Sequence, residues 1–297
     1  MGPRVYPSYQ NVSQLLPTPT PTGSVTPTPT PTQTPTPTPT PTPGIPISTT
    51  NLRFYVDGQS ISYPSTGTIW YNLATPGIPG YYNGDLFGSP LFNQTTLKNY
   101  FSFNGLTQYT IQNVGRSQDN NYDYSYTWGG WFRLSRGPVL KSLMAFGIGL
   151  TYTTDYVGCS LNLYKDTNDY LAVQLYKQID PTPSTPRELT STLVRSSTKI
   201  PNDEWCYITA VYSKNSQIQI YLNATLIVTG AVPAAGHLIW NGLTGVDPGW
   251  NLCYGGNLEA GHSHFTRMDV GDMEVYQTAL GGSQILSNYN AQSYKYI

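Results

Sequence analysis

The chain of 297 residues has little charge. Asp, Glu, Lys and Arg together make up 10% of it, and the formal net charge is −1. Typical soluble domains carry about 25% charged residues, so Asn, Gln, Ser, Thr and the 25 tyrosines must make this surface polar instead. A chain so close to neutrality has no electrostatic basis for binding nucleic acid or an anionic membrane. We expect neither partner.

Cysteine and long apolar runs are also scarce. The three cysteines, Cys159, Cys206 and Cys253, lie in strand-like contexts and lack the Cys-x-x-Cys spacing of a metal site. We interpret them as small buried hydrophobic residues, and their disulfide state stays open. The sequence shows no basic start followed by an apolar run, and no apolar segment long enough to span a bilayer. We therefore expect neither a secretory signal nor membrane insertion.

Proline and threonine, by contrast, dominate one segment. Residues 17–43 consist almost entirely of these two residue types, and eleven of the 27 positions are proline. Each proline fixes its own φ and biases the preceding residue toward an extended backbone. The tract predicts a stiff polyproline II rod, roughly 80 Å long at about 3.1 Å per residue.

This rod divides the chain into three predicted parts: an anchor peptide at 1–16, a Pro-Thr stalk at 17–46 and a folded head at 47–297. The first part is too short to fold alone, so we expect it to bind a larger particle as an extended peptide. Its aromatic and aliphatic side chains are the candidates for that contact: Tyr6, Tyr9, Leu15 and Leu16.

The head is predicted to consist of many short strands separated by Gly, Pro and Asn turns. Apolar side chains alternate with polar ones in 52–57, 208–213 and 268–275, and 161–175 has the pattern of a hairpin. Only Leu280 to Ala291 has helical spacing. This pattern favours an all-β fold, a two-sheet antiparallel sandwich with a short C-terminal helix.

Ten segments of the head follow one another in a characteristic order: 54–57, 62–73, 83–84, 101–105, 126–132, 205–212, 220–223, 269–276, 279–280 and 285–291. In this order they resemble the concanavalin A-like lectin superfamily, in its laminin G-like branch. This version of the pattern is similar to domains on virion proteins of tailed phages, including those of cyanobacteria. The resemblance implies a jelly-roll sandwich that often binds glycans at loop tips, sometimes with calcium. It covers roughly residues 51–294.

The most site-like stretch of the head runs from Gly236 to His264. Aromatic faces bind the C–H patches of sugars, and Asn, Asp and His bind their hydroxyls, so this stretch is the candidate glycan site. The alternative is that its tryptophans pack beneath the loop as local core and that its histidines are merely exposed, or hold zinc with a carboxylate. The candidate residues are Trp240, Asn241, Asp247, Trp250, Tyr254, His262 and His264.

Asp272 and Glu274 are two residues apart in a predicted strand and therefore share one face. They either anchor loops or face solvent, bind calcium, or form a catalytic pair. The hydrolase branch of the resembled superfamily carries Glu-x-Asp-x-x-Glu, and no glutamate that we tested is followed by x-Asp: Glu188, Glu204, Glu259 and Glu274. We expect no enzymatic activity and no required cofactor, with calcium as the candidate ion.

Three functions follow in order of preference. The first is a virion structural protein, a capsid decoration protein, head fibre or tail appendage at the virion surface. It would contact other virion proteins through its N-terminal segment, occur as a homo-oligomer or in many copies, and present a lectin-like head to host glycans. The second is a secreted or cell-surface carbohydrate-binding module or adhesin, located outside the cell. The third is a glycoside hydrolase.

Overall fold

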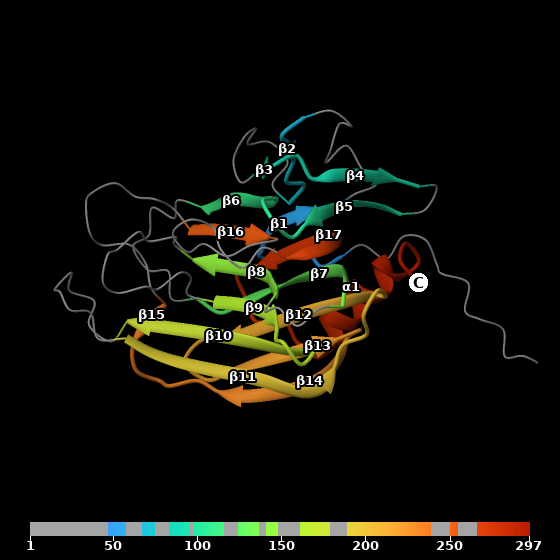
Figure 1. Cartoon of the computed structure of the whole chain (residues 1–297). Helices are drawn as coiled ribbons and strands as arrows, with labels where there is room; N and C mark the ends of the chain where they lie inside the picture. Colours follow the sequence, from blue (N-terminus) through green and yellow to red (C-terminus); the bar gives the residue numbers. More distant parts are fainter. Residues whose placement is uncertain are drawn as a thin grey trace, which may run out of the picture. The chain divides into compact units, whose positions relative to one another are not determined.

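The computed structural model describes residues 47–57, 67–74, 83–95, 98–115, 124–136, 141–147, 161–178, 189–238, 250–254 and 266–297. The predicted anchor, with Tyr6, Tyr9, Leu15 and Leu16, and the stalk lie outside these residues. Within them, seventeen strands form two antiparallel sheets, and the chain ends in one helix (Figure 1). The predicted all-β sandwich with a short C-terminal helix is therefore confirmed.

The first sheet, sheet A, has eight strands in the order β14-β13-β12-β7-β17-β5-β4, and β1 pairs with β17 beside this path. Its strands are β1 (Leu52–Val56), β4 (Leu91–Gln94), β5 (Asn99–Asn104), β7 (Tyr126–Leu134), β12 (Trp205–Ser213), β13 (Gln217–Leu222), β14 (Thr225–Ala231) and β17 (Arg267–Tyr276).

The second sheet, sheet B, has nine strands in the order β11-β10-β9-β8-β16-β6-β3-β2, and β15 pairs with β10 beside this path. Its strands are β2 (Ile69–Trp70), β3 (Gly84–Phe87), β6 (Tyr109–Gly115), β8 (Lys141–Gly147), β9 (Leu161–Lys165), β10 (Tyr170–Gln178), β11 (Leu189–Lys199), β15 (His237–Leu238) and β16 (Trp250–Tyr254).

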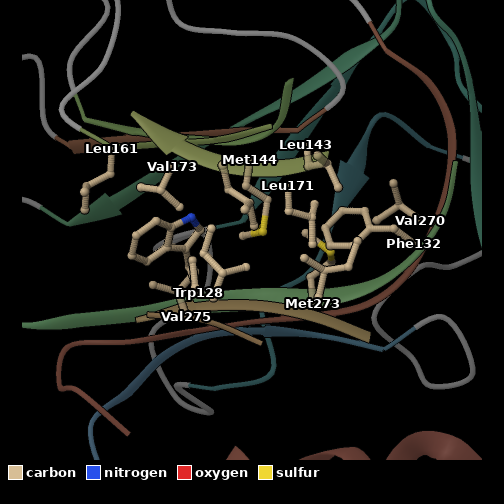
Figure 2. Packing of buried hydrophobic residues seen from close by; sticks show 14 of the residues in the cluster. Trp128, Phe132, Leu143, Met144, Leu161, Leu171, Val173, Val270, Met273 and Val275 are labelled. Atoms are coloured by element: carbon tan, nitrogen blue, oxygen red, sulfur yellow. The ribbon is translucent and has the colours of Figure 1, made fainter. Parts of the chain in front are cut away.

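The core lies between the two sheets (Figure 2). Trp128 of β7 points from sheet A toward Leu161 of β9 and Val173 of β10 in sheet B. Phe132, further along β7, points toward Leu143 of β8, and all five side chains are fully buried. Burial of each large apolar side chain contributes about 1.5–3 kcal/mol. The alternation of strand side chains places every second residue of β7 and β12 in this core. In β17 the register shifts between Val270 and Met273, so its core residues are Met268, Val270, Met273 and Val275.

The outer face of sheet A carries the helix α1 (Gly282–Ser293). The helix begins two residues later than predicted because Gly281 keeps an extended backbone and donates its N–H to Oε1 of Gln284 at 3.0 Å. Ile285 of α1 packs with Trp131 and Tyr207 in a second buried cluster, on the face opposite the core. In the described part of the chain, no helix is long and apolar enough to cross a membrane.

Candidate functional site

The predicted glycan stretch falls largely outside the described residues. Trp240, Asn241, Asp247, His262 and His264 all lie there, and their role stays a prediction. Trp250 and Tyr254 are the first and last residues of β16, which pairs with β6 and β8 inside sheet B. These two residues therefore belong to a strand of the sheet, and their role in glycan binding stays a prediction.

The carboxylates of Asp272 and Glu274 face the helix side of sheet A and are 0% and 1% exposed. Lys295 donates to Asp272 at 2.6 Å and contacts Asp57 at 3.1 Å, and the Tyr296 hydroxyl donates to Asp272 at 2.8 Å. These contacts fasten the residues after α1 to β17. Of the predicted roles for Asp272, anchoring is the one that this geometry supports.

Glu274 has a comparable set of protein donors. Asn288 of α1 donates to its two oxygens at 3.1 and 3.2 Å, Tyr276 at 3.3 Å, and the Tyr207 hydroxyl donates to Oε1. Calcium requires six to eight oxygen ligands, whereas here hydrogen-bond donors surround Glu274 and the ammonium of Lys295 adjoins Asp272. These donors favour anchoring over calcium binding at Asp272 and Glu274, and the calcium alternative stays a prediction. Among the described residues, no group of three His, Cys, Asp or Glu could hold a metal ion.

Burial also sets the protonation of this cluster. Burial, with Asp57 nearby, raises the pKa of Asp272 to about 7, although Lys295 and Tyr296 oppose the shift. Burial alone would lower the pKa of Lys295, but its two carboxylate partners raise it, so the ammonium stays charged. Burial likewise raises the pKa of Glu274. Neither acid is open to a substrate, so the two cannot act as a glycosidase pair.

A groove opens on the same outer face of sheet A, where Tyr296 and Ile297, which follow α1, line one side of it; we call it the groove beside α1. Strand register places Trp205 of β12 opposite Arg133 of β7, Arg133 opposite Asp269 of β17, and Asp269 opposite Ser102 of β5. The four side chains thus form one row across four neighbouring strands. We call this row the outer-face row.

Hydrogen bonds fix the polar part of the outer-face row. Arg133 Nε donates to Asp269 Oδ2 at 2.6 Å, and Nη2 lies 2.5 Å from the same oxygen. The Ser102 hydroxyl donates to Asp269 Oδ1 at 2.5 Å, and Asn93 Nδ2 donates to the Ser102 hydroxyl at 2.8 Å. Partial burial alone would lower the pKa of Arg133, but the bond to Asp269 raises it. The guanidinium is therefore a fixed cation.

Aromatic rings surround this guanidinium. Its carbon lies 5.4 Å from the ring centroid of Tyr100 and 5.6 Å from that of Trp205. The two rings meet edge to face with centroids 5.4 Å apart, and Trp205 also contacts Tyr296 at 4.8 Å. Tyr296 stacks on Trp131 under the helix, with centroids 4.7 Å apart. The aromatic contacts thus continue from the buried cluster to the open groove.

The groove has two adjoining lobes that share Arg133 and Asp203. The aromatic lobe has a volume of about 480 Å³ and includes Tyr100 and Trp205. The polar lobe has a volume of about 370 Å³ and includes Ser102 and Asp269. Both volumes fall in the usual range of ligand sites, about 300–1,000 Å³.

Sequence reasoning missed this groove. Trp128, Trp131 and Trp205 all lie in strands, but Trp128 and Trp131 are fully buried, whereas Trp205 is partly exposed. Alternation along β12 could have placed Trp205 on the face opposite Cys206 and Ile208. It could not have told which part of that face the helix leaves open.

No protein-family model matches the chain, and no curated protein sequence does. Solved structures match in fold. The binding domain of Paraclostridial Mosquitocidal Protein 1 superposes with a TM-score of 0.56 at 11% identity, over 81% of this chain and 52% of that one. The binding domain of botulinum neurotoxin DC in complex with SialylT superposes with a TM-score of 0.54 at 13% identity, over 82% of this chain and 52% of that one.

The same neurotoxin domain in complex with rat synaptotagmin II gives a TM-score of 0.53 at 13% identity, over 82% of this chain and 52% of that one. This chain spans about half the length of each of these structures. At such identities the likeness shows a shared β-sandwich fold. The fold of this chain is therefore one that also occurs in receptor-binding domains of toxins.

Proposed function

We propose that the head is a lectin-like, non-enzymatic binding domain and that the groove beside α1 is its glycan site. The outer-face row carries this proposal. A sugar ring presents a patch of C–H groups next to hydroxyls, which suits a site with aromatic rings on one side and fixed hydrogen-bonding groups on the other. Trp205 and Tyr100 supply the aromatic rings, and Arg133, Asp269 and Ser102 supply the hydrogen-bonding groups.

The fold adds support by analogy. The solved structures that share it are named as binding domains, and one of them is in complex with SialylT. Fold alone does not define a function, so the groove remains the stronger argument. The absence of catalysis is supported by the burial of Asp272 and Glu274, the one carboxylate pair that the sequence offered for glycoside hydrolysis.

In this proposal the head is displayed at the surface of a virion. It is a laminin G-like domain of the kind found on tailed phages. The peptide at 1–16 binds the particle through Tyr6, Tyr9, Leu15 and Leu16, and the Pro-Thr stalk spaces the head from it. Many copies on one particle would turn weak glycan binding into strong attachment, because each further contact is made at high effective concentration.

Two experiments test these two parts separately. For binding, the full chain is applied to an array of bacterial and animal glycans, and specific retention of at least one glycan is expected. For display, a chain lacking residues 1–16 is expected to be absent from purified particles. Unchanged incorporation of the shortened chain would refute the anchor. Glycan binding by a chain that no particle contains would favour the secreted or cell-surface adhesin.

A further inference from the structure

We infer that the groove beside α1 selects uncharged oligosaccharides and excludes acidic ones. This inference rests on the proposed glycan-binding function and narrows it to one class of ligand. It follows from the charges that line the two lobes, from their length across the sheet and from their division into an aromatic and a polar part.

Among the side chains that line each lobe, positive and negative charges are equal in number. The aromatic lobe has two basic and two acidic side chains: Lys98, Arg133, Asp203 and Glu204. The polar lobe has the same balance: Arg133, Arg267, Asp203 and Asp269. Opposite charges that line one small site cancel most of the field that an incoming ion would meet.

The groups at the centre of the groove reinforce this balance. Arg133 is shared by both lobes, and Asp269 already takes up its charge through contacts of 2.5 and 2.6 Å. At Arg133, a sugar carboxylate or sulfate would have to displace Asp269 or bind beside it. Like charges placed side by side cost affinity. Hydroxyls, which both donate and accept, meet no such penalty.

The dimensions indicate more than one sugar unit. The outer-face row crosses from β12 to β5, which is three interstrand spacings of about 4.8 Å, or roughly 14 Å. This distance exceeds the length of a single sugar ring. The aromatic lobe can cover the C–H face of one unit while the polar lobe binds the hydroxyls of the next.

The chain contains a matched control for the outer-face row. On sheet B, Arg195 of β11 lies 4.2 Å from the ring centroid of Tyr170 and pairs with Asp166 at 2.5 Å. This trio has the same chemistry as Arg133, Tyr100 and Asp269, and it lines neither lobe. Arg195→Gln therefore removes an arginine–tyrosine–aspartate surface without changing the groove.

The experiment uses the full chain and an array of neutral hexose oligomers, each beside a sialylated, uronic or sulfated counterpart. We expect neutral oligomers alone to be retained, with a Kd that changes less than about twofold between roughly 50 and 500 mM NaCl. Arg133→Gln should weaken binding at least about tenfold, because it removes hydrogen bonds from a charged donor. Arg195→Gln should stay within about twofold.

A gain of binding gives a second, independent readout. Asp203→Asn together with Glu204→Gln leaves the aromatic lobe with two basic side chains and no acidic side chain. Asp203 has a positive φ of 62°, which Asn adopts readily, so the change should preserve the turn. We expect this double variant to retain acidic glycans that the unchanged chain rejects.

Each outcome decides a separate point. Retention of acidic glycans by the unchanged chain would overturn the charge inference and leave the proposed function intact. Neutral binding that survives Arg133→Gln and Trp205→Ala but is lost in Trp240→Ala would overturn the assignment to this groove. Should Trp205→Ala fail to fold, Arg133→Gln still decides. No retention of any glycan would refute the proposed function itself.

Discussion

Replacing Lys295 by Met tests how the outer layer is held to sheet A. The Lys295 ammonium is buried and lies 2.6 Å from Asp272 and 3.1 Å from Asp57. Lys295→Met keeps most of the apolar stem and removes the cation, which leaves the fully buried Asp272 without its counter-charge. Breaking a buried ion pair on one side costs about 3–5 kcal/mol. We expect that loss in the free energy of unfolding at pH 8.

The pH dependence of this cost follows from Asp272. Its pKa of about 7 in the folded chain is above the value of about 3.9 in an unfolded chain. The folded state therefore binds this proton first, so this group's contribution to stability grows as the pH falls from about 7 to about 4. The full difference is on the order of 4 kcal/mol. At pH 5.5 the carboxyl is protonated in both proteins, so Lys295→Met should cost less than half as much as at pH 8.

Equilibrium unfolding in guanidinium chloride at pH 8 and at pH 5.5 measures the loss of stability that Lys295→Met causes at each pH. The double variant Asp272→Asn, Lys295→Met removes the buried charge and should recover much of the stability lost at pH 8. Lys214→Met, at an exposed lysine, is the control and should stay within about 0.5 kcal/mol. A cost below about 1 kcal/mol at pH 8, or one that does not change with pH, would refute this reasoning.

Two further predictions concern packing and reactivity. A Cβ on Gly130 of β7 would lie 2.3 Å from the backbone oxygen of Asp272, so Gly130→Ala should lower the unfolding free energy by more than about 2 kcal/mol. Gly282→Ala, whose Cβ would meet nothing nearer than 3.8 Å, should instead stabilise α1 by about 0.5–1 kcal/mol. Thermal unfolding of the two variants measures both changes. Burial raises the pKa of Cys206 to about 11, so its thiol should resist iodoacetamide at pH 8 until denaturant is added, as followed by mass spectrometry of its peptide.

Local patterns were enough to predict the strands and turns of the head. Alternation gave the hairpin of β9 and β10, in which Leu163 pairs with Val173 as expected. Asn223 and Ala224 form the turn between β13 and β14, and both residues have positive φ, 49° and 61°, as type I′ hairpin turns require. Of the three cysteines, Cys206 is buried as predicted; its disulfide state was left open, and it is free.

Contacts between distant segments could not be predicted in this way. Arg133 and Asp269 are 136 residues apart and meet only because β7 and β17 pair in one register. Asp272 and Glu274 were recognised as sharing a face, but their partners Lys295 and Asn288 come from the segment that packs over that face. Tertiary packing therefore determines which carboxylates are covered and which residues line a groove.

The most direct test of the central claim is oxidative footprinting of the full chain with and without a bound neutral oligosaccharide. If the groove beside α1 is the glycan site, the ligand will protect Trp205 and Tyr100 from oxidation, and Tyr170 on sheet B will react as before. Unchanged oxidation of Trp205 and Tyr100 at saturating ligand, or protection confined to residues 236–264, would contradict the account.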